Sequence, residues 1–113
     1  MSRSPKRILF LCSQNKLRSP TAETVFADRA DLEVDSAGLN NDAIVPLSVE
    51  QLEWADLVVV MEKCHRERLN RKFRAHLGGK RIIVLNIPDD YQYMDPELVK
   101  LLGNRCSSFI PSR

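Results

Sequence analysis

The sequence has no apolar run long enough to cross a membrane, and its first residues lack the hydrophobic stretch of a secretion signal. Cysteine is scarce, with three widely spaced residues, an odd number that argues against a disulfide framework and favours a reducing compartment. Seventeen basic and fifteen acidic residues leave a net charge of +2, too small to indicate nucleic-acid binding. These absences predict a cytoplasmic protein with neither membrane nor nucleic acid as its partner.

What is present is a regular alternation of short apolar runs and helical patterns within 113 residues, a length that suits one domain. The runs at residues 8–11, 32–36, 57–61 and 82–85 predict strands, and those at 20–30, 48–54, 63–74 and from 95 onward predict helices. This order predicts an α/β fold, a single three-layer domain with a four-stranded parallel sheet and helices on both faces. We expect this domain to span residues 7–113 after a flexible lead-in at 1–6.

The first strand brings Cys12 to its carboxyl end, and Arg18 follows shortly before Ser19 and Pro20. Ser-Pro is typical of a helix start, because the hydroxyl can cap the helix and proline suits its first position. A helix N-terminus attracts anions, and the planar arginine fork matches a phosphate. A thiol in that positive field is expected to be partly thiolate, and so a nucleophile for phosphoryl transfer.

A simpler interpretation makes Cys12 a buried strand-end cysteine and Arg18 a solvated surface residue. The strand before the loop and the helix start after it favour the chemical interpretation, because a motif needs the right structural context.

Residues 12–19, CSQNKLRS, resemble the phosphate-binding loop of the low-molecular-weight protein tyrosine phosphatases, whose pattern is C-x-G-N-x-C-R-S. Further segments resemble that family in the right order. They are residues 19–26 for its first helix, 34–38 for its second strand and turn, 55–62 and 69–72 for its third strand and helix, and 87–91 for the segment with its catalytic acid. The resemblance covers most of the chain and implies the fold of that family.

The resemblance implies a phosphatase that hydrolyses phosphotyrosine or other aryl phosphates through a phosphocysteine, without metal or cofactor. Cys12 would be the nucleophile, Arg18 and the loop would hold the phosphate, and Asp89 would be the general acid. The implied phosphate-binding residues are Ser13, Gln14, Asn15, Lys16, Leu17, Arg18 and Ser19. The substrate would be a phosphorylated protein or a small aryl phosphate, and phosphate, sulfate or vanadate-like oxyanions would inhibit.

Supporting roles follow from the same resemblance. Ser36 would hydrogen-bond the side chain of Asn15, a residue type that also tolerates a left-handed backbone. Ser19 would donate to the thiolate. Tyr91 would flank the pocket mouth and stack on an aryl group, although a loop anchor is an equally good interpretation.

Three aspartates compete for the role of general acid. Asp89 follows the fourth strand and precedes Tyr91 as in the family, with Asp90 as its neighbouring alternative. Asp95 stands in an Asp-Pro dipeptide like that of the family, but the cap of the last helix explains it better. Because carboxyl ends of parallel strands meet at one edge, Cys12, Glu62 and the Asp89 loop should converge there.

The sequence also departs from the family pattern. Gln14 replaces a glycine, so a position that often needs an unusual backbone must be reached with a side chain. Leu17 replaces a second cysteine, which removes a disulfide partner for the nucleophile. The chain is shorter than typical members, mostly between the second and third strands, which predicts a shallow pocket.

Other functions remain open at this point. The departures allow a non-enzymatic phosphate- or phosphoprotein-binding module. Thiol-dependent arsenate reduction would need further cysteines, for which Cys64 and Cys106 are poor candidates. Cys64 and His65 could suggest zinc, but no second ligand pair has the right spacing, so we predict no metal site. The basic stretch 63–74 is predicted to be a solvated helix face, with contact to an acidic protein or a nucleic acid as the alternative.

Overall fold

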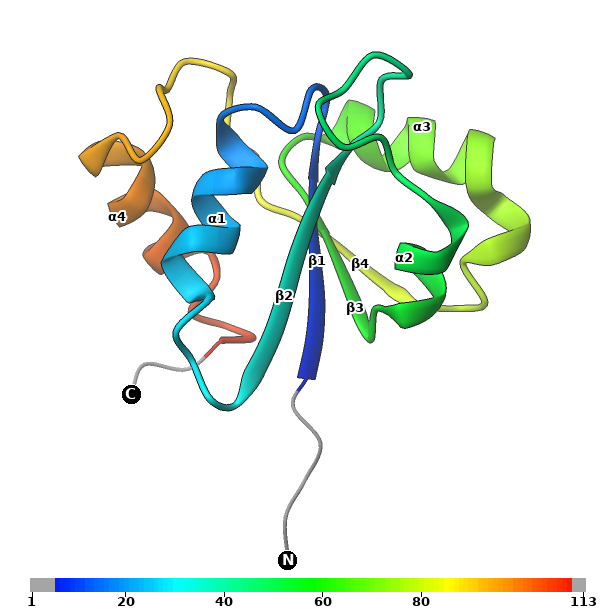
Figure 1. Cartoon of the computed structure of the whole chain (residues 1–113), viewed down its shortest axis with the longest axis horizontal. Helices are drawn as coiled ribbons and strands as arrows, with labels where there is room; N and C mark the ends of the chain where they lie inside the picture. The colour runs from blue at the N-terminus through cyan, green and yellow to red at the C-terminus, as the bar shows by residue number, and fades with distance from the viewer. Residues whose placement is uncertain (1–5, 111–113) are drawn as a thin grey trace, which may run out of the picture.

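The computed structural model describes residues 6–110 and shows strands alternating with helices along the chain (Figure 1). The elements are β1 (Lys6–Cys12), α1 (Arg18–Phe26), β2 (Leu32–Gly38), α2 (Val49–Trp54), β3 (Leu57–Val60), α3 (Lys63–Phe73), the 3-10 helix η1 (Arg74–His76), β4 (Arg81–Val84) and α4 (Pro96–Arg105). Residues 1–5 of the expected lead-in lie outside the described residues, and Lys6 already begins β1.

The four strands form one parallel sheet in the order β2-β1-β3-β4. Alternate residues of β1 enter two separate cores: Ile8 and Phe10 pack with α1 and α4, whereas Leu9 and Leu11 pack with α2 and α3. Figure 1 shows these helix pairs on opposite faces of the sheet. Burial of both faces explains why the two central strands, β1 and β3, contain continuous apolar runs. The predicted three-layer fold with a four-stranded parallel sheet is confirmed.

The carboxyl ends of the strands meet at one edge, where the loops after β1, β2 and β4 gather at the top of Figure 1. β1 lies in the middle, with its neighbours β2 and β3 on either side. In parallel α/β sheets a ligand site forms at such an edge. The fold therefore places the loop after β1 where a site is expected.

The first helix differs from its predicted bounds. α1 begins at Arg18 and ends at Phe26, earlier at both ends than the predicted helix at 20–30. Its N-cap is Leu17, an apolar side chain that cannot make a capping bond, and Ser19, the expected cap, lies inside the helix with its hydroxyl 3.0 Å from the sulfur of Cys12. Ala30, the last residue of the predicted helix, is exposed and lies outside α1.

Two other helix starts have side-chain caps. Ser48 and Gln51 form a capping box at the start of α2, which falls in the predicted helix at 48–54. The side chain of Asp95 accepts a hydrogen bond from the backbone of Glu97 and caps α4. None of the helices in the described part of the chain has the length and apolar character that crossing a bilayer requires.

Candidate active site

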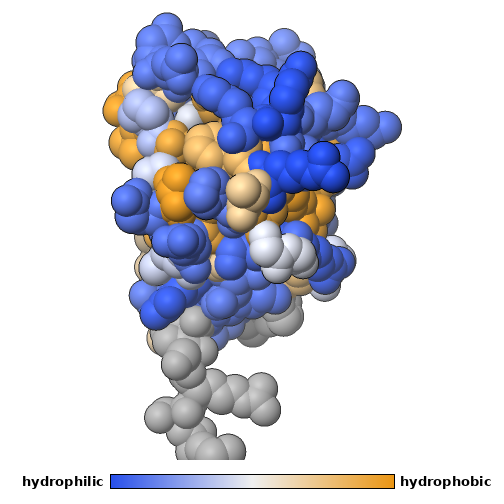
Figure 2. Space-filling model, turned by 90° about the vertical axis from the view of Figure 1, so that its right-hand side faces the viewer, coloured by the Kyte–Doolittle hydropathy of each residue, from blue (hydrophilic) through white to orange (hydrophobic). Residues whose placement is uncertain are grey.

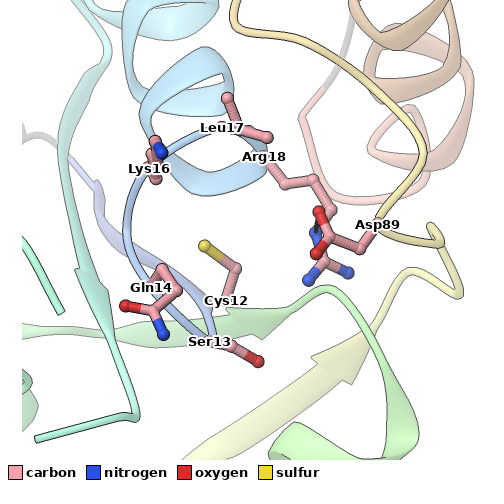
Figure 3. Close-up of a pocket in the computed structure, with 7 residues that line it drawn as sticks. All are labelled: Cys12, Ser13, Gln14, Lys16, Leu17, Arg18 and Asp89. Atoms are coloured by element: carbon pink, nitrogen blue, oxygen red, sulfur yellow. Dashed lines mark ion pairs between the residues drawn. The ribbon is translucent and has the colours of Figure 1, made fainter. Parts of the chain in front are cut away.

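A pocket of about 240 Å³ opens at the end of β1, in the loop that leads to α1. Its walls come from Cys12, Ser13, Gln14, Lys16, Leu17, Arg18 and, from the loop after β4, Asp89 (Figure 3). The sequence predicted all seven as site residues, and the structure brings them together around one cavity.

The backbone of the loop is held from outside by the segment that follows β2. Its carbonyl groups accept hydrogen bonds from that segment in the pairs Leu39 to Cys12, Asn40 to Ser13 and Ile44 to Gln14, each 2.9 Å long. In a trans peptide the N–H of the next residue points opposite to the carbonyl. The N–H groups of residues 13, 14 and 15 therefore point away from this segment and are available for an anion.

Gly38 allows this close approach. A Cβ atom there would lie 2.7 Å from the carbonyl oxygen of Ser13 and 2.9 Å from the backbone nitrogen of Asn15. Both are closer than Cβ atoms normally come, so only glycine fits beside the loop without moving its backbone.

Asn15 adopts the left-handed conformation that the residue type suggested, with φ of 55°. Its amide nitrogen donates to the hydroxyl of Ser36 at 2.9 Å, as predicted, and to Ser19 at 3.0 Å. Ser36 in turn donates to the carboxylate of Glu23. Gln14 is not among the residues with positive φ, so replacing the family's glycine there requires no left-handed backbone.

The sulfur of Cys12 lies inside the ring of lining residues in Figure 3. Its side chain is buried, and Sγ lies 3.0 Å from the hydroxyl of Ser19. Because Ser19 also receives a bond from Asn15, its own proton can be directed at the sulfur at 3.0 Å or at the carbonyl of Ala37 at 3.5 Å, and the sulfur is the nearer acceptor. A hydroxyl donor at this distance stabilises a thiolate.

Arg18 is only 3% exposed and is held by two neighbouring loops. Nη1 donates to Oε2 of Glu62 at 2.5 Å and to the carbonyl of Ile87 at 2.9 Å. Nε lies 3.6 Å from Oδ1 of Asp89. Since Nη1 carries two hydrogens, these bonds occupy it fully, and an oxyanion can bind to Nη2 and to Nε, which lies beside Asp89. Two carboxylates of the protein itself, Glu62 and Asp89, compensate the buried charge of Arg18.

The three candidate aspartates have different places. Asp89 lines the pocket beside Arg18 and is 65% exposed, so it can reach a bound group. Asp90 is exposed and is not a lining residue. Asp95 caps α4. Geometry therefore favours Asp89 as the acid.

Tyr91, the expected aromatic flank, is not among the residues that line the pocket. It packs against the core beneath α1 and α4 and lines a separate hollow beside α4. The ring packs against that core and so anchors the loop, which is the second of the two interpretations of Tyr91. The neighbouring Tyr93 is exposed and pairs with the hydroxyl of Thr24.

His65 is a fully buried residue whose role the sequence did not predict. Its Nδ1 accepts a bond from the backbone N–H of Glu62 at 3.1 Å, so Nε2 carries the proton and donates to the hydroxyl of Ser13 at 2.9 Å. Burial, reinforced by the nearby charge of Arg18, lowers the pKa of His65 to about 4. The neutral ring thus links α3 to the loop.

Potential ligand atoms of Glu62, Cys64 and His65 lie within 4.8 Å of one another. Both ring nitrogens of His65 are already engaged, and Glu62 holds Arg18. A metal at this cluster would break those bonds, so we assign no metal site to it.

The strand–loop–helix unit that forms the site also matches a known protein family in sequence. The sequence profile of the low molecular weight phosphotyrosine protein phosphatases matches residues 7–45, which cover β1, the loop, α1 and β2. Together with the fold, this match confirms the resemblance to that family.

Particular solved structures share the fold over nearly the whole chain. The YwlE arginine phosphatase from Geobacillus stearothermophilus is 22% identical, covers 92% of this chain and 92% of its own, and has a TM-score of 0.72. The tyrosine phosphatase Wzb from Escherichia coli K30, in complex with phosphate, is 20% identical, covers 94% and 96%, and has a TM-score of 0.74. A cysteine-to-serine variant of YwlE with a phosphorylated active-site serine is 23% identical, covers 95% and 97%, and has a TM-score of 0.70. No curated protein sequence matches the chain.

Proposed function

We propose that this protein is a phosphatase that hydrolyses aryl phosphate monoesters, including phosphotyrosine, through a phosphocysteine formed on Cys12. The observation that carries the proposal is the shared pocket of Cys12, Arg18 and Asp89 beneath backbone amides turned away from residues 39–44. A nucleophile, an oxyanion clamp and an acid are the groups that phosphoryl transfer needs.

In the first step the thiolate of Cys12 attacks phosphorus, a P–S bond forms and the P–O ester bond breaks. Asp89 gives its proton to the departing oxygen. The free edge of Arg18 and the amides of residues 13–15 hold the remaining phosphoryl oxygens. Glu62 and the carbonyl of Ile87 keep the guanidinium in place during the reaction.

In the second step Asp89, now a carboxylate, takes a proton from water as that water attacks phosphorus. The P–S bond breaks, and inorganic phosphate and the thiolate leave. The hydroxyl of Ser19, 3.0 Å from the sulfur, stabilises the returning negative charge. Its position supports the departure of Cys12 as a leaving group.

Two structural relatives support this proposal. Wzb of Escherichia coli K30 has been determined with phosphate, which supports oxyanion binding at such a loop. The YwlE variant with a phosphorylated active-site serine supports a covalent phosphoenzyme.

Arsenate reduction by a cysteine relay has less support. Cys106 is fully buried in the core, and burial raises the pKa of its thiol to about 12. A relay thiol must ionise and reach a partner. Cys64 is exposed but would lack that second partner.

The test measures hydrolysis of p-nitrophenyl phosphate and of a phosphotyrosine peptide in metal-free buffer. Wild type should turn over both, with inhibition by vanadate and phosphate. Cys12→Ser should lose turnover and keep vanadate or phosphate binding, whereas Cys64→Ser, a control at an exposed thiol, should remain active. Unchanged activity in Cys12→Ser would refute the mechanism. Oxyanion binding without turnover in wild type would favour the binding-module alternative.

A further inference from the structure

The charges around the pocket are unevenly compensated. Its lining residues include two cations, Lys16 and Arg18, and one anion, Asp89. Arg18 already has the carboxylates of Glu62 and Asp89. Lys16 is exposed and has no ion pair or hydrogen bond with any other residue in the described range 6–110. The mouth of the pocket therefore has one cation that no group within residues 6–110 neutralises.

Figure 3 shows where this cation lies. Arg18 and Asp89 are on one side of the Cys12 sulfur, and Lys16 and Gln14 are on the other. With the ester oxygen beside Asp89, a substituent of the leaving group that lies over the opposite side of the mouth would approach Lys16. The Lys16 ammonium is thus placed to attract a negatively charged substituent of the leaving group and to repel a positively charged one.

We propose that Lys16 makes this site selective for phosphate esters whose leaving group carries an additional anionic group, and disfavours cationic leaving groups such as the guanidinium of phosphoarginine. This inference rests on the proposed phosphatase activity and names its substrate class. The distinction matters because the fold is shared by a tyrosine phosphatase and an arginine phosphatase, so the fold alone does not choose between them.

The size of the effect follows from the exposure of Lys16. Charge pairs in a solvated mouth interact weakly, and salt screens them over about 8 Å at physiological ionic strength. We expect a preference of about three- to tenfold in kcat/KM at low salt, which shrinks as salt is added. A buried contact would give a larger and less salt-dependent ratio.

The experiment uses three substrates: phenyl phosphate, 3-carboxyphenyl phosphate and 3-(trimethylammonio)phenyl phosphate. Each is measured with wild type, Lys16→Met and Lys16→Glu, and each substrate is compared with itself across variants so that its intrinsic reactivity cancels. Relative to phenyl phosphate, Lys16→Met should lower kcat/KM for the carboxylate about three- to tenfold and raise it for the ammonium. Lys16→Glu should shift both ratios further.

Lys100→Met is the matched control, because it removes the same charge from an exposed position on α4 that does not line the pocket. It should leave the ratios unchanged. Equal effects of Lys16→Met on all three substrates would mean that Lys16 acts on the phosphate alone, and equal shifts in Lys100→Met would mean a long-range field. Either result overturns the inference.

A binding experiment separates this inference from the proposed activity. The phosphonate analogues of the three substrates are titrated calorimetrically into Cys12→Ser and into the same protein with Lys16→Met. Selective binding that Lys16→Met removes supports the inference even when wild type hydrolyses nothing, and in that case only the proposed function fails. Unselective binding overturns the inference alone, and no binding overturns both.

Discussion

Nη1 of Arg18 lies 2.5 Å from Oε2 of Glu62, so the guanidinium at the start of α1 is fixed by the carboxylate of the N-cap residue of α3. The pair joins the segments that follow two neighbouring strands, β1 and β3. Glu62 is 37% exposed and Arg18 is buried, so the carboxylate keeps its contact with water while it compensates the buried charge. These contacts fix the orientation of the Arg18 guanidinium before a ligand binds.

The first prediction tests this positioning. Glu62→Ala should lower kcat/KM for p-nitrophenyl phosphate about 10- to 100-fold, since small displacements of an aligned group are costly, and should weaken inhibition by vanadate. Glu62→Gln should recover part of the loss, because its amide oxygen still accepts from Nη1. Glu67→Ala, on the same helix and exposed, is the control. An equal loss in Glu67→Ala, or none in Glu62→Ala, would contradict the assigned role.

The second prediction concerns Asp89. Asp89→Asn should reduce kcat/KM about 100-fold for phenyl phosphate and much less for p-nitrophenyl phosphate, because a good leaving group needs little protonation. The measurement is the dependence of kcat/KM on leaving-group pKa, which should steepen in the variant. Asp90→Asn should resemble wild type. Should Asp90→Asn instead steepen the dependence, Asp90 would be the acid.

The third prediction uses the pKa of His65, which lies at about 4 in the folded protein and near 6.5 when unfolded. Between these values the unfolded chain binds the extra proton, so stability should fall as the pH is lowered from 6.5 to 4, by at most about 3 kcal/mol. Above pH 6.5 and below pH 4, His65 does not contribute to the pH dependence of the free energy of unfolding. Urea unfolding across this range should show the slope in wild type and a smaller one in His65→Gln. Identical slopes would mean that His65 titrates normally.

The fourth prediction separates the two contributions of Asn15. Asn15→Gly keeps access to positive φ and removes the bonds to Ser19 and Ser36, whereas Asn15→Ala loses both. We expect Asn15→Ala to be less stable than Asn15→Gly by about 1 kcal/mol, the cost of left-handed backbone for a residue with Cβ. Both should lose phosphatase activity. Thermal unfolding checks the order, and equal melting temperatures would show that φ is not the constraint.

Local patterns predicted the sheet well, because β1 and β3 contain buried apolar runs and each crossover is a helix. The same logic predicted that Cys12, Glu62 and the Asp89 loop would meet, since all follow strands. The bond from Asn15 to Ser36 was predicted by resemblance and is confirmed. Helix ends were predicted less well, because Ser19 bonds to Cys12 instead of capping α1.

The remaining features depend on contacts between distant parts of the chain. Nothing near His65 in sequence indicates that the hydroxyl of Ser13 will accept a hydrogen bond from its Nε2. Tyr91 could have packed inward or faced the pocket, and only the fit of its ring against α1 and α4 decided between them. Likewise, the sequence did not show which loop residue adopts the left-handed backbone conformation. It is Asn15 and not Gln14. Tertiary packing determines these side-chain orientations and backbone conformations, and local sequence patterns carry no information about that packing.

The most direct test of the central claim is to trap the intermediate. Wild-type protein is quenched with acid during steady turnover of p-nitrophenyl phosphate, digested and analysed by mass spectrometry, with Asp89→Asn as a variant in which the phosphoenzyme should accumulate. The account predicts a phosphoryl group on the peptide that contains Cys12, and none on peptides that contain Cys64 or Cys106. Steady hydrolysis with an unmodified Cys12 in both proteins would contradict it.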